Sequence, residues 1–231
     1  MTFLLASGWT TLLYFGFFVR SKYRTVKPPY ERFVLFAMAG MLSTIPAAYF
    51  NARVLNDTAL NFFETPDIRM GVLGVFLAPG LGEEFWKMAA GLLVVSCLNR
   101  RSRPVQPAEC VLGFAVVGMA FAVIENIWSY GDGGAAYLLL RGLIAVPLHT
   151  SMCMLHGVGV LLYWKRRRAW PLYVFYLTTA LLHGLWDVAS IYGSSVREIW
   201  LPLSVIAVYT LAISVWCAVP ERQAQPQGLS A

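Results

Sequence analysis

Charged residues are scarce in this chain, and their scarcity argues against an ordinary soluble domain. Only 13% of the 231 residues are Asp, Glu, Lys or Arg, 58% are hydrophobic, and the mean hydropathy is +0.61. A soluble domain carries about 25% charged residues. The chain also lacks a Cys-x-x-Cys pair and a His-Glu-x-x-His sequence. The usual sequence signals of redox dithiols, zinc ribbons and many zinc peptidases are therefore missing.

Long apolar segments account for most of the chain. A membrane-spanning helix needs about 20 apolar residues, and seven segments of about this length or longer occur, at 2–19, 33–50, 71–98, 110–130, 137–163, 171–192 and 199–219. We therefore predict an all-α fold, a polytopic membrane helical bundle of about seven transmembrane helices. The third and fifth segments are long enough to tilt, or to break at Pro79-Gly80 or at Pro147.

The domain organisation follows from these segments. We expect one integral membrane domain over residues 1–219, with its core at about 71–192, and a polar, disordered cytoplasmic tail over 220–231. The first segment has no basic residue before Arg20 and no small-residue cleavage site. It is therefore expected to be a retained span rather than a cleaved signal peptide.

Basic residues collect on alternate loops. Most of the 18 Lys and Arg residues follow the first, third and fifth segments, in the stretches 20–32, 100–103 and 165–168, whereas the other loops are mainly acidic. Cytoplasmic loops carry the excess of Lys and Arg. This pattern predicts an extracytoplasmic N-terminus and a cytoplasmic C-terminus. It also explains the net charge of +6 without a nucleic-acid partner; the expected surroundings are the lipid bilayer.

Ionisable residues inside the expected spans are confined to the third to sixth segments. They are Glu83, Glu84, Lys87, Glu125, His149, His183 and Asp187. A charged residue at the centre of a spanning helix costs about 2.5 to 3.5 kcal/mol on insertion scales, so such residues generally have a function. We predict a four-helix catalytic core with three flanking helices. His156 is a secondary candidate, and Arg141 is expected to snorkel toward the outer boundary.

The spacing of these residues indicates shared helix faces. His183 and Asp187 are four residues apart, so the carboxylate can orient the imidazole. Lys87 lies three and four residues after the two glutamates and can pair with either. Adjacent Glu83 and Glu84 diverge by about 100° around the helix, so one can face a cavity while the other supports it.

Paired carboxylates with nearby imidazoles suit the activation of water. A carboxylate can hold a water molecule for attack on a carbonyl, while His149 or His183, with the amide of Asn126, can stabilise the oxyanion or protonate the leaving amine. At a rise of 1.5 Å per residue, the groups on the four helices lie at compatible depths between the membrane midplane and its outer half.

Four short motifs resemble those of the PrsW family of intramembrane proteases, which is related to the CAAX prenyl endopeptidase and bacteriocin-processing superfamily. They are "EEFWK" at 83–87, "FAVIEN" at 121–126, "PLHTSM" at 147–152 and "HGLWD" at 183–187. Their order on consecutive spans, rather than any one motif, carries the resemblance. It covers about residues 75–190.

The resemblance implies a glutamic-type endopeptidase in a bacterial plasma membrane, acting on a membrane-anchored, single-span protein such as an anti-sigma factor at an extracytoplasmic site. By position, the catalytic candidates are Glu83, Glu84, Glu125, His149 and His183. The supporting candidates are Lys87, Asn126 and Asp187. The wider superfamily often has a histidine where this chain has Glu125, so which group supports the water stays open.

Three alternatives remain at this point. No cofactor is expected, but a zinc-dependent protease could use Glu83, Glu84, His149 and His183 as its metal ligands. A proton-coupled transporter could use the same groups as a relay, although the chain is small and has no apparent inverted repeat. A non-catalytic membrane scaffold is the third alternative.

Overall fold

A computed structural model describes residues 13, 15–21, 23, 29–100 and 104–192. Its helical elements are α2 (Tyr30–Leu55), α3 (Ile68–Val75), the π-helix η1 (Phe76–Glu83), α4 (Glu84–Asn99), α5 (Pro107–Tyr130), the short 3₁₀ element η2 (Gly131–Gly133), α6 (Gly134–Arg166) and α7 (Trp170–Tyr192). The described chain is helical and has no strand, which confirms the all-α prediction. The seventh expected span at 199–219 and the tail at 220–231 lie outside the described residues, as does most of the first span.

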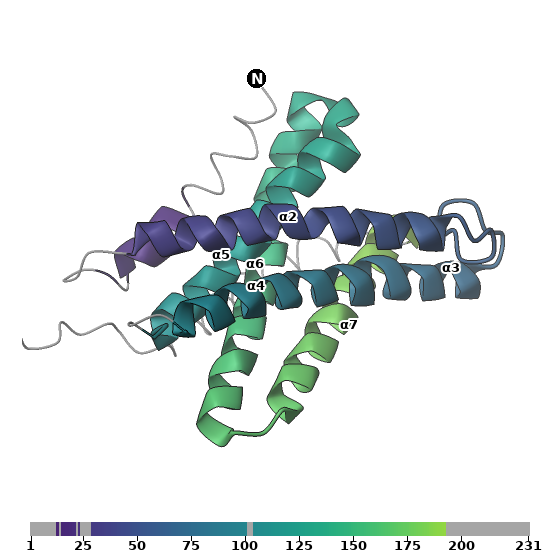
Figure 1. Ribbon diagram of the computed structural model, residues 1–231. Helices are drawn as coiled ribbons and strands as arrows, with labels where there is room; N and C mark the ends of the chain where they lie inside the picture. Colours follow the sequence, from purple (N-terminus) through teal and green to yellow (C-terminus); the bar gives the residue numbers. More distant parts are fainter. Residues whose placement is uncertain (1–12, 14, 22, 24–28, 101–103, 193–231) are drawn as a thin grey trace, which may run out of the picture.

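Two long helices run side by side in Figure 1, and the other helices cross them. One is α2, and the other is the continuous helix formed by α3, η1 and α4. Helices α5 and α6 make the most extensive helix pair, α2 also packs on α5, and α7 packs on both α6 and η1. Helices α6 and α7 form a hairpin at the bottom of the view.

The helix bounds agree with the expected spans. Helices α2, α5, α6 and α7 are each long and apolar enough to cross a membrane. The α3–η1–α4 helix covers the third expected span, with its N-terminus capped by Asp67, whose side chain accepts a hydrogen bond from the amide of Arg69 at 2.9 Å. Helix α6 continues through Pro147 without a break.

The expected irregularity at Pro79-Gly80 is a π-helical segment rather than a break. Proline has no amide hydrogen, and its ring collides with the carbonyl four residues before it in an α-helix. The wider π turn over Phe76–Glu83 relieves this conflict and keeps the helix continuous. The segment ends at Glu83, so the change in winding sets the directions in which Glu83 and Glu84 point.

Glycines allow close contact between the central helices. A side chain at Gly40 on α2 would overlap the backbone of Val117 on α5, and one at Gly118 on α5 would overlap the carbonyl of His149 on α6. Small residues at helix contacts are typical of membrane bundles, where close packing replaces much of the hydrophobic driving force. The Gly118 contact fixes the position of His149.

Candidate active site

A cavity of about 530 Å³ lies at one end of the bundle, between five helical segments. Its wall is formed by the C-terminal parts of α2, α5 and α7, the N-terminal half of α6, and η1. Side chains of the α2–α3 loop, Phe62 and Phe63, complete it. All of these segments meet at the end of the bundle away from the C-terminal end of α4 and the basic stretch 165–168.

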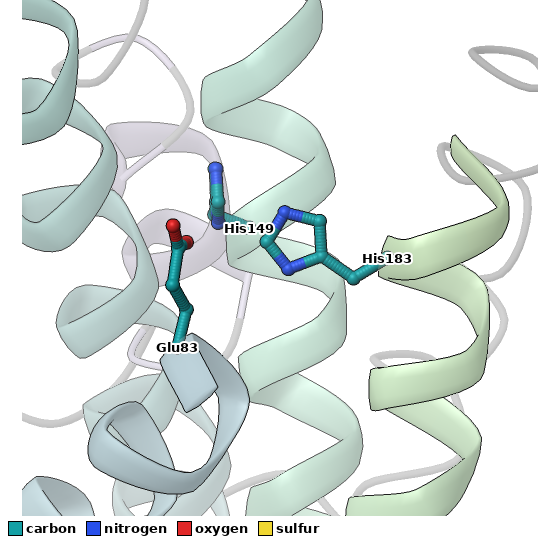
Figure 2. A group of neighbouring side chains, drawn as sticks. All are labelled: Glu83, His149 and His183. Atoms are coloured by element: carbon teal, nitrogen blue, oxygen red, sulfur yellow. The ribbon is translucent and has the colours of Figure 1, made fainter. Parts of the chain in front are cut away.

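Three polar side chains converge on this cavity from three helices (Figure 2). Glu83 comes from η1, His149 from α6 and His183 from α7. Their side chains offer one ligand atom each, and these atoms lie within 4.8 Å of one another. The imidazole rings of His149 and His183 meet edge to face, with centroids 4.9 Å apart. The structure thus places three candidate residues from the third, fifth and sixth expected segments side by side.

The two adjacent glutamates have different surroundings, as their angular separation predicts. Glu83 lines the cavity. Glu84 is fully buried on the inner side, where its Oε1 lies 2.7 Å from Lys87 Nζ and 2.9 Å from His183 Nδ1. Because an ionised carboxylate only accepts hydrogen bonds, Glu84 makes Nδ1 of His183 the donor. A carboxylate–histidine pair of this kind fixes the tautomer of an imidazole that binds a metal or acts in catalysis.

Lys87 joins the two acids to the second histidine. Its Nζ lies 3.4 Å from Glu83 Oε2 and 2.7 Å from His149 Nδ1, and it stands over the Phe121 ring, 4.3 Å from the centroid. The lysine is completely buried. A buried ammonium group needs several partners to offset its desolvation, and these contacts supply them. Lys87 is thus the centre of the polar network beneath the cavity.

Glu125 faces the other ring nitrogen of His149, the one that Lys87 does not contact. Its Oε2 is 3.1 Å from His149 Nε2, close enough for an ion pair, although the alignment is not that of a hydrogen bond. Its Oε1 is 3.2 Å from Arg141 Nη2. Arg141 also donates from Nε to Asn126 Oδ1 at 2.7 Å and stacks on the Tyr130 ring. Arg141 therefore balances the charge of Glu125 in the cavity wall, a role that the expectation of a snorkelling side chain did not include.

Two expected supporting residues are less central than the sequence suggests. Asn126 is buried and bonds Arg141, and it is not among the residues that line the cavity. Asp187 lines the cavity, but its Oδ2 is 3.5 Å from His183 Nε2. Glu84, on another helix, is the nearer carboxylate partner of His183. Spacing along one helix could not reveal that contact.

A second polar group lies deeper in the bundle. His156 Nε2 is 2.7 Å from Thr179 Oγ1 and 3.6 Å from Glu84 Oε2, and Cys153 is within the same group. Glu84, Cys153 and His156 are all buried, and none of them lines the cavity. This group connects α4, α6 and α7 and reaches the cavity only through Glu84.

Helix α2 also contributes to the site, which its sequence did not indicate. Asn51 donates from Nδ2 to Glu83 Oε1 at 2.9 Å and lines the cavity. The residue follows directly after the expected span 33–50 and is not ionisable, so a search for charges within spans passes over it. Helix α2 is therefore part of the site rather than a flanking helix.

The residues of the cavity fit a divalent metal ion in type and proximity. One glutamate and two histidines form the ligand set of several catalytic zinc sites. Glu83 Oε2 is buried, and beyond its ion pair with Lys87 at 3.4 Å it accepts no hydrogen bond from the residues that the structure describes. Such an oxygen is available to a cation or to a water molecule. Of the four metal ligands considered from the sequence, Glu84 does not line the cavity. It binds His183 Nδ1 and Lys87 on the inner side of the site instead.

Comparison with known proteins gives one result. A sequence profile of the family described as PrsW family intramembrane metalloprotease matches residues 28–217, which is most of the chain and includes every residue of the cavity. Neither the curated proteins nor the solved structures give a match.

Proposed function

This chain belongs to the PrsW family of intramembrane metalloproteases, and from that membership we propose that it hydrolyses a peptide bond of a membrane-anchored protein in the cavity around Glu83. One observation carries this assignment. The Glu83 carboxylate stands at the cavity wall beside two imidazoles, and its Oε2, 3.4 Å from the Lys87 ammonium, accepts no hydrogen bond within the described chain. This is the arrangement that a water-activating carboxylate requires.

The proposed reaction uses Glu83 as the base. The carboxylate takes a proton from water as the water oxygen attacks the scissile carbonyl carbon, and the same proton then passes to the leaving amine as the carbon–nitrogen bond breaks. His149 and His183 stand beside Glu83. His149 can donate its Nε2–H to the developing oxyanion, whereas His183, whose Nδ1–H is taken by Glu84, can donate from Nε2 only as the imidazolium. Glu84 and Lys87 hold the two imidazoles in place. Glu125 and Arg141 close the far side of the site.

The family description implies a metal ion. Glu83, His149 and His183 would hold it, because they form the closest ligand group at the cavity. When bound, a divalent ion polarises the scissile carbonyl and makes water a stronger nucleophile. Glu125, whose Oε2 lies 3.1 Å from His149 Nε2 in the cavity wall, would then be the carboxylate placed to accept the proton. The metal-free reaction, favoured by the sequence analysis alone, is the alternative.

The position of the cavity supports an extracytoplasmic cleavage site. Its walls come from the helix ends next to the α2–α3 and α5–α6 loops, which the charge pattern assigns to the outside of the membrane. A single-span protein in a bacterial plasma membrane would present the outer part of its helix at this depth. Anchored anti-sigma factors, named by the family resemblance, are the first substrates to test.

Two variants and a chelator test this proposal. The purified protein in liposomes is given a panel of fluorogenic single-span peptides, as wild type, as Glu83→Gln and as Glu31→Gln. Glu31 is an exposed carboxylate at the start of α2 and serves as the control. We expect Glu83→Gln to lose cleavage by at least about 100-fold, in the range seen for catalytic acid–base groups, and Glu31→Gln to match wild type.

The chelator decides between the two chemistries. Loss of cleavage with a strong chelator and its return with zinc would support the metal site. Cleavage that persists after exhaustive chelation but disappears in Glu83→Gln would support direct activation of water by the carboxylate. Equal activity of Glu83→Gln and wild type, or no cleavage of any peptide by the wild-type protein, would contradict the proposal.

A further inference from the structure

Asn51 connects α2 to the carboxylate at the centre of the cavity. Its Nδ2 lies 2.9 Å from Glu83 Oε1. An ionised carboxylate can accept hydrogen bonds but cannot donate them. The amide nitrogen of Asn51 must therefore face Glu83, and its amide oxygen must face away. The orientation of the Asn51 amide is therefore fixed by its partner.

The amide oxygen of Asn51 has no partner of its own. Oδ1 is buried and accepts no hydrogen bond from any residue in the described part of the chain. A buried polar atom left in this condition weakens a fold, and buried amide oxygens are normally satisfied. Asn51 nevertheless stands in the wall of the cavity, next to Glu83. Because Oδ1 is buried in this structure, a donor of a bound molecule reaches it through a small movement of the cavity wall.

A membrane-spanning substrate brings such donors when it is cleaved. The amide hydrogens of a spanning helix are bonded within the helix, and the peptide bond becomes accessible only after the helix is locally unwound. The released N–H groups then need acceptors, because unsatisfied backbone groups are costly away from water. A fixed side-chain oxygen close to the water-activating carboxylate meets this need.

We propose that Asn51 binds the substrate backbone and positions Glu83 at the same time. Its Nδ2 holds the carboxylate, and its Oδ1 accepts a hydrogen bond from a backbone N–H of the unwound substrate beside the scissile bond. This inference rests on the proposed function, since it takes Glu83 as the reacting carboxylate or as a metal ligand.

Ester-containing substrates test this hydrogen bond directly. In the best-cleaved peptide of the panel, the N–H of each residue near the scissile bond, except the scissile amide itself, is replaced in turn by an ester oxygen, which removes one donor and leaves the side chains and the reacting bond unchanged. With the wild-type protein, we expect one of these replacements to lower kcat/KM about tenfold, the usual value of one hydrogen bond left unmade in a buried site.

The same peptides are then given to the Asn51→Ala and Asn51→Ser variants. We expect either variant to lower kcat/KM for the parent peptide. Within each variant, kcat/KM for the sensitive ester should lie within about twofold of kcat/KM for the parent peptide, because the acceptor is already gone. Serine keeps a small polar group if alanine disturbs the fold. The control is Asn99→Ala, an asparagine at the end of α4 whose Oδ1 accepts a hydrogen bond from the Val105 amide away from the cavity, and this variant should keep the full ester effect.

The outcomes separate the inference from the proposed function. If Glu83→Gln abolishes cleavage while the ester effect is the same in wild type and in both Asn51 variants, the inference is wrong and the proposed function stands. If no ester lowers kcat/KM in the wild type, Oδ1 has no role in binding the backbone. If Glu83→Gln cleaves normally, the proposed function and the inference both fail.

Discussion

The Nζ atom of Lys87 lies 2.7 Å from Nδ1 of His149, which joins α4 to α6 directly beneath the cavity. Since the lysine also pairs with Glu84 and Glu83, it is a charged donor, and Nδ1 of His149 must accept. The ring proton of a neutral His149 is then on Nε2, the nitrogen that faces Glu125. The lysine thus selects the tautomer of His149 as Glu84 selects that of His183.

Replacing Lys87 should destabilise the protein strongly. In Lys87→Met the fully buried Glu84 loses its closest cationic partner, and breaking one side of a buried ion pair costs about 3 to 5 kcal/mol. We expect a clear fall in the midpoint of thermal unfolding in detergent. The double variant Lys87→Met with Glu84→Gln should recover part of the loss, because the charge left alone is then removed as well.

The matched control for Lys87 is Lys165 near the end of α6, which is exposed. Lys165→Met should leave the unfolding midpoint close to that of the wild type, since exposed charges contribute little. A Lys87→Met protein as stable as Lys165→Met would show that the buried network is not a source of stability.

Replacing His183 should mainly reduce cleavage, whereas replacing His156 should mainly reduce stability. His183 stands at the cavity and His156 lies below it, bonded to Thr179. We expect His183→Ala to lower kcat/KM by at least about 100-fold. His156→Ala should lower the free energy of unfolding by about 1 to 3 kcal/mol through the lost buried hydrogen bond, with kcat/KM within about tenfold of wild type.

Thr179→Val gives the control for His156. It removes the same hydrogen bond from the other side and should reproduce the stability loss of His156→Ala, again with little effect on cleavage. Equal losses of cleavage in the His183 and His156 variants would mean that the deeper polar group takes part in the reaction.

Gly118 should be sensitive to the smallest added side chain. A methyl group there would overlap the His149 carbonyl, so α5 and α6 must separate in Gly118→Ala. Overpacking of this kind costs about 1 to 3 kcal/mol, and cleavage should fall with the displacement of His149. Gly16 has no neighbour within 4 Å of such a group, and Gly16→Ala should change neither unfolding nor cleavage. Identical behaviour of the two variants would contradict the close α5–α6 contact.

The parts of the fold that follow from residue type were predictable from the sequence. Apolar length gave the positions of five helices within a few residues, and Pro79 marked the π-helical segment. Helical periodicity separated the direction of Glu83 from that of Glu84. These features depend on each segment alone, and hydrophobicity or backbone geometry determines them.

The remaining features depend on contacts between segments. Glu84 rather than Asp187 is the nearer partner of His183, and Arg141 pairs with Glu125 on a neighbouring helix. Asn51 reaches Glu83 from α2, a helix whose expected span contains no ionisable residue. Spacing within one helix cannot predict how neighbouring helices are rotated, and a neutral amide gives no signal in a search for buried charge.

The orientation of the bundle predicts which loops can be labelled from outside. Glu64 is exposed in the α2–α3 loop at the cavity end, and Arg168 is exposed in the α6–α7 loop at the opposite end. Because Lys and Arg concentrate on the cytoplasmic side, we expect Glu64→Cys to react with a membrane-impermeant maleimide in right-side-out vesicles and Arg168→Cys to react in inverted vesicles. The wild-type chain, with its own cysteines, gives the background. The reverse labelling pattern would place the cavity on the cytoplasmic side and would require a substrate cleaved at its inner end.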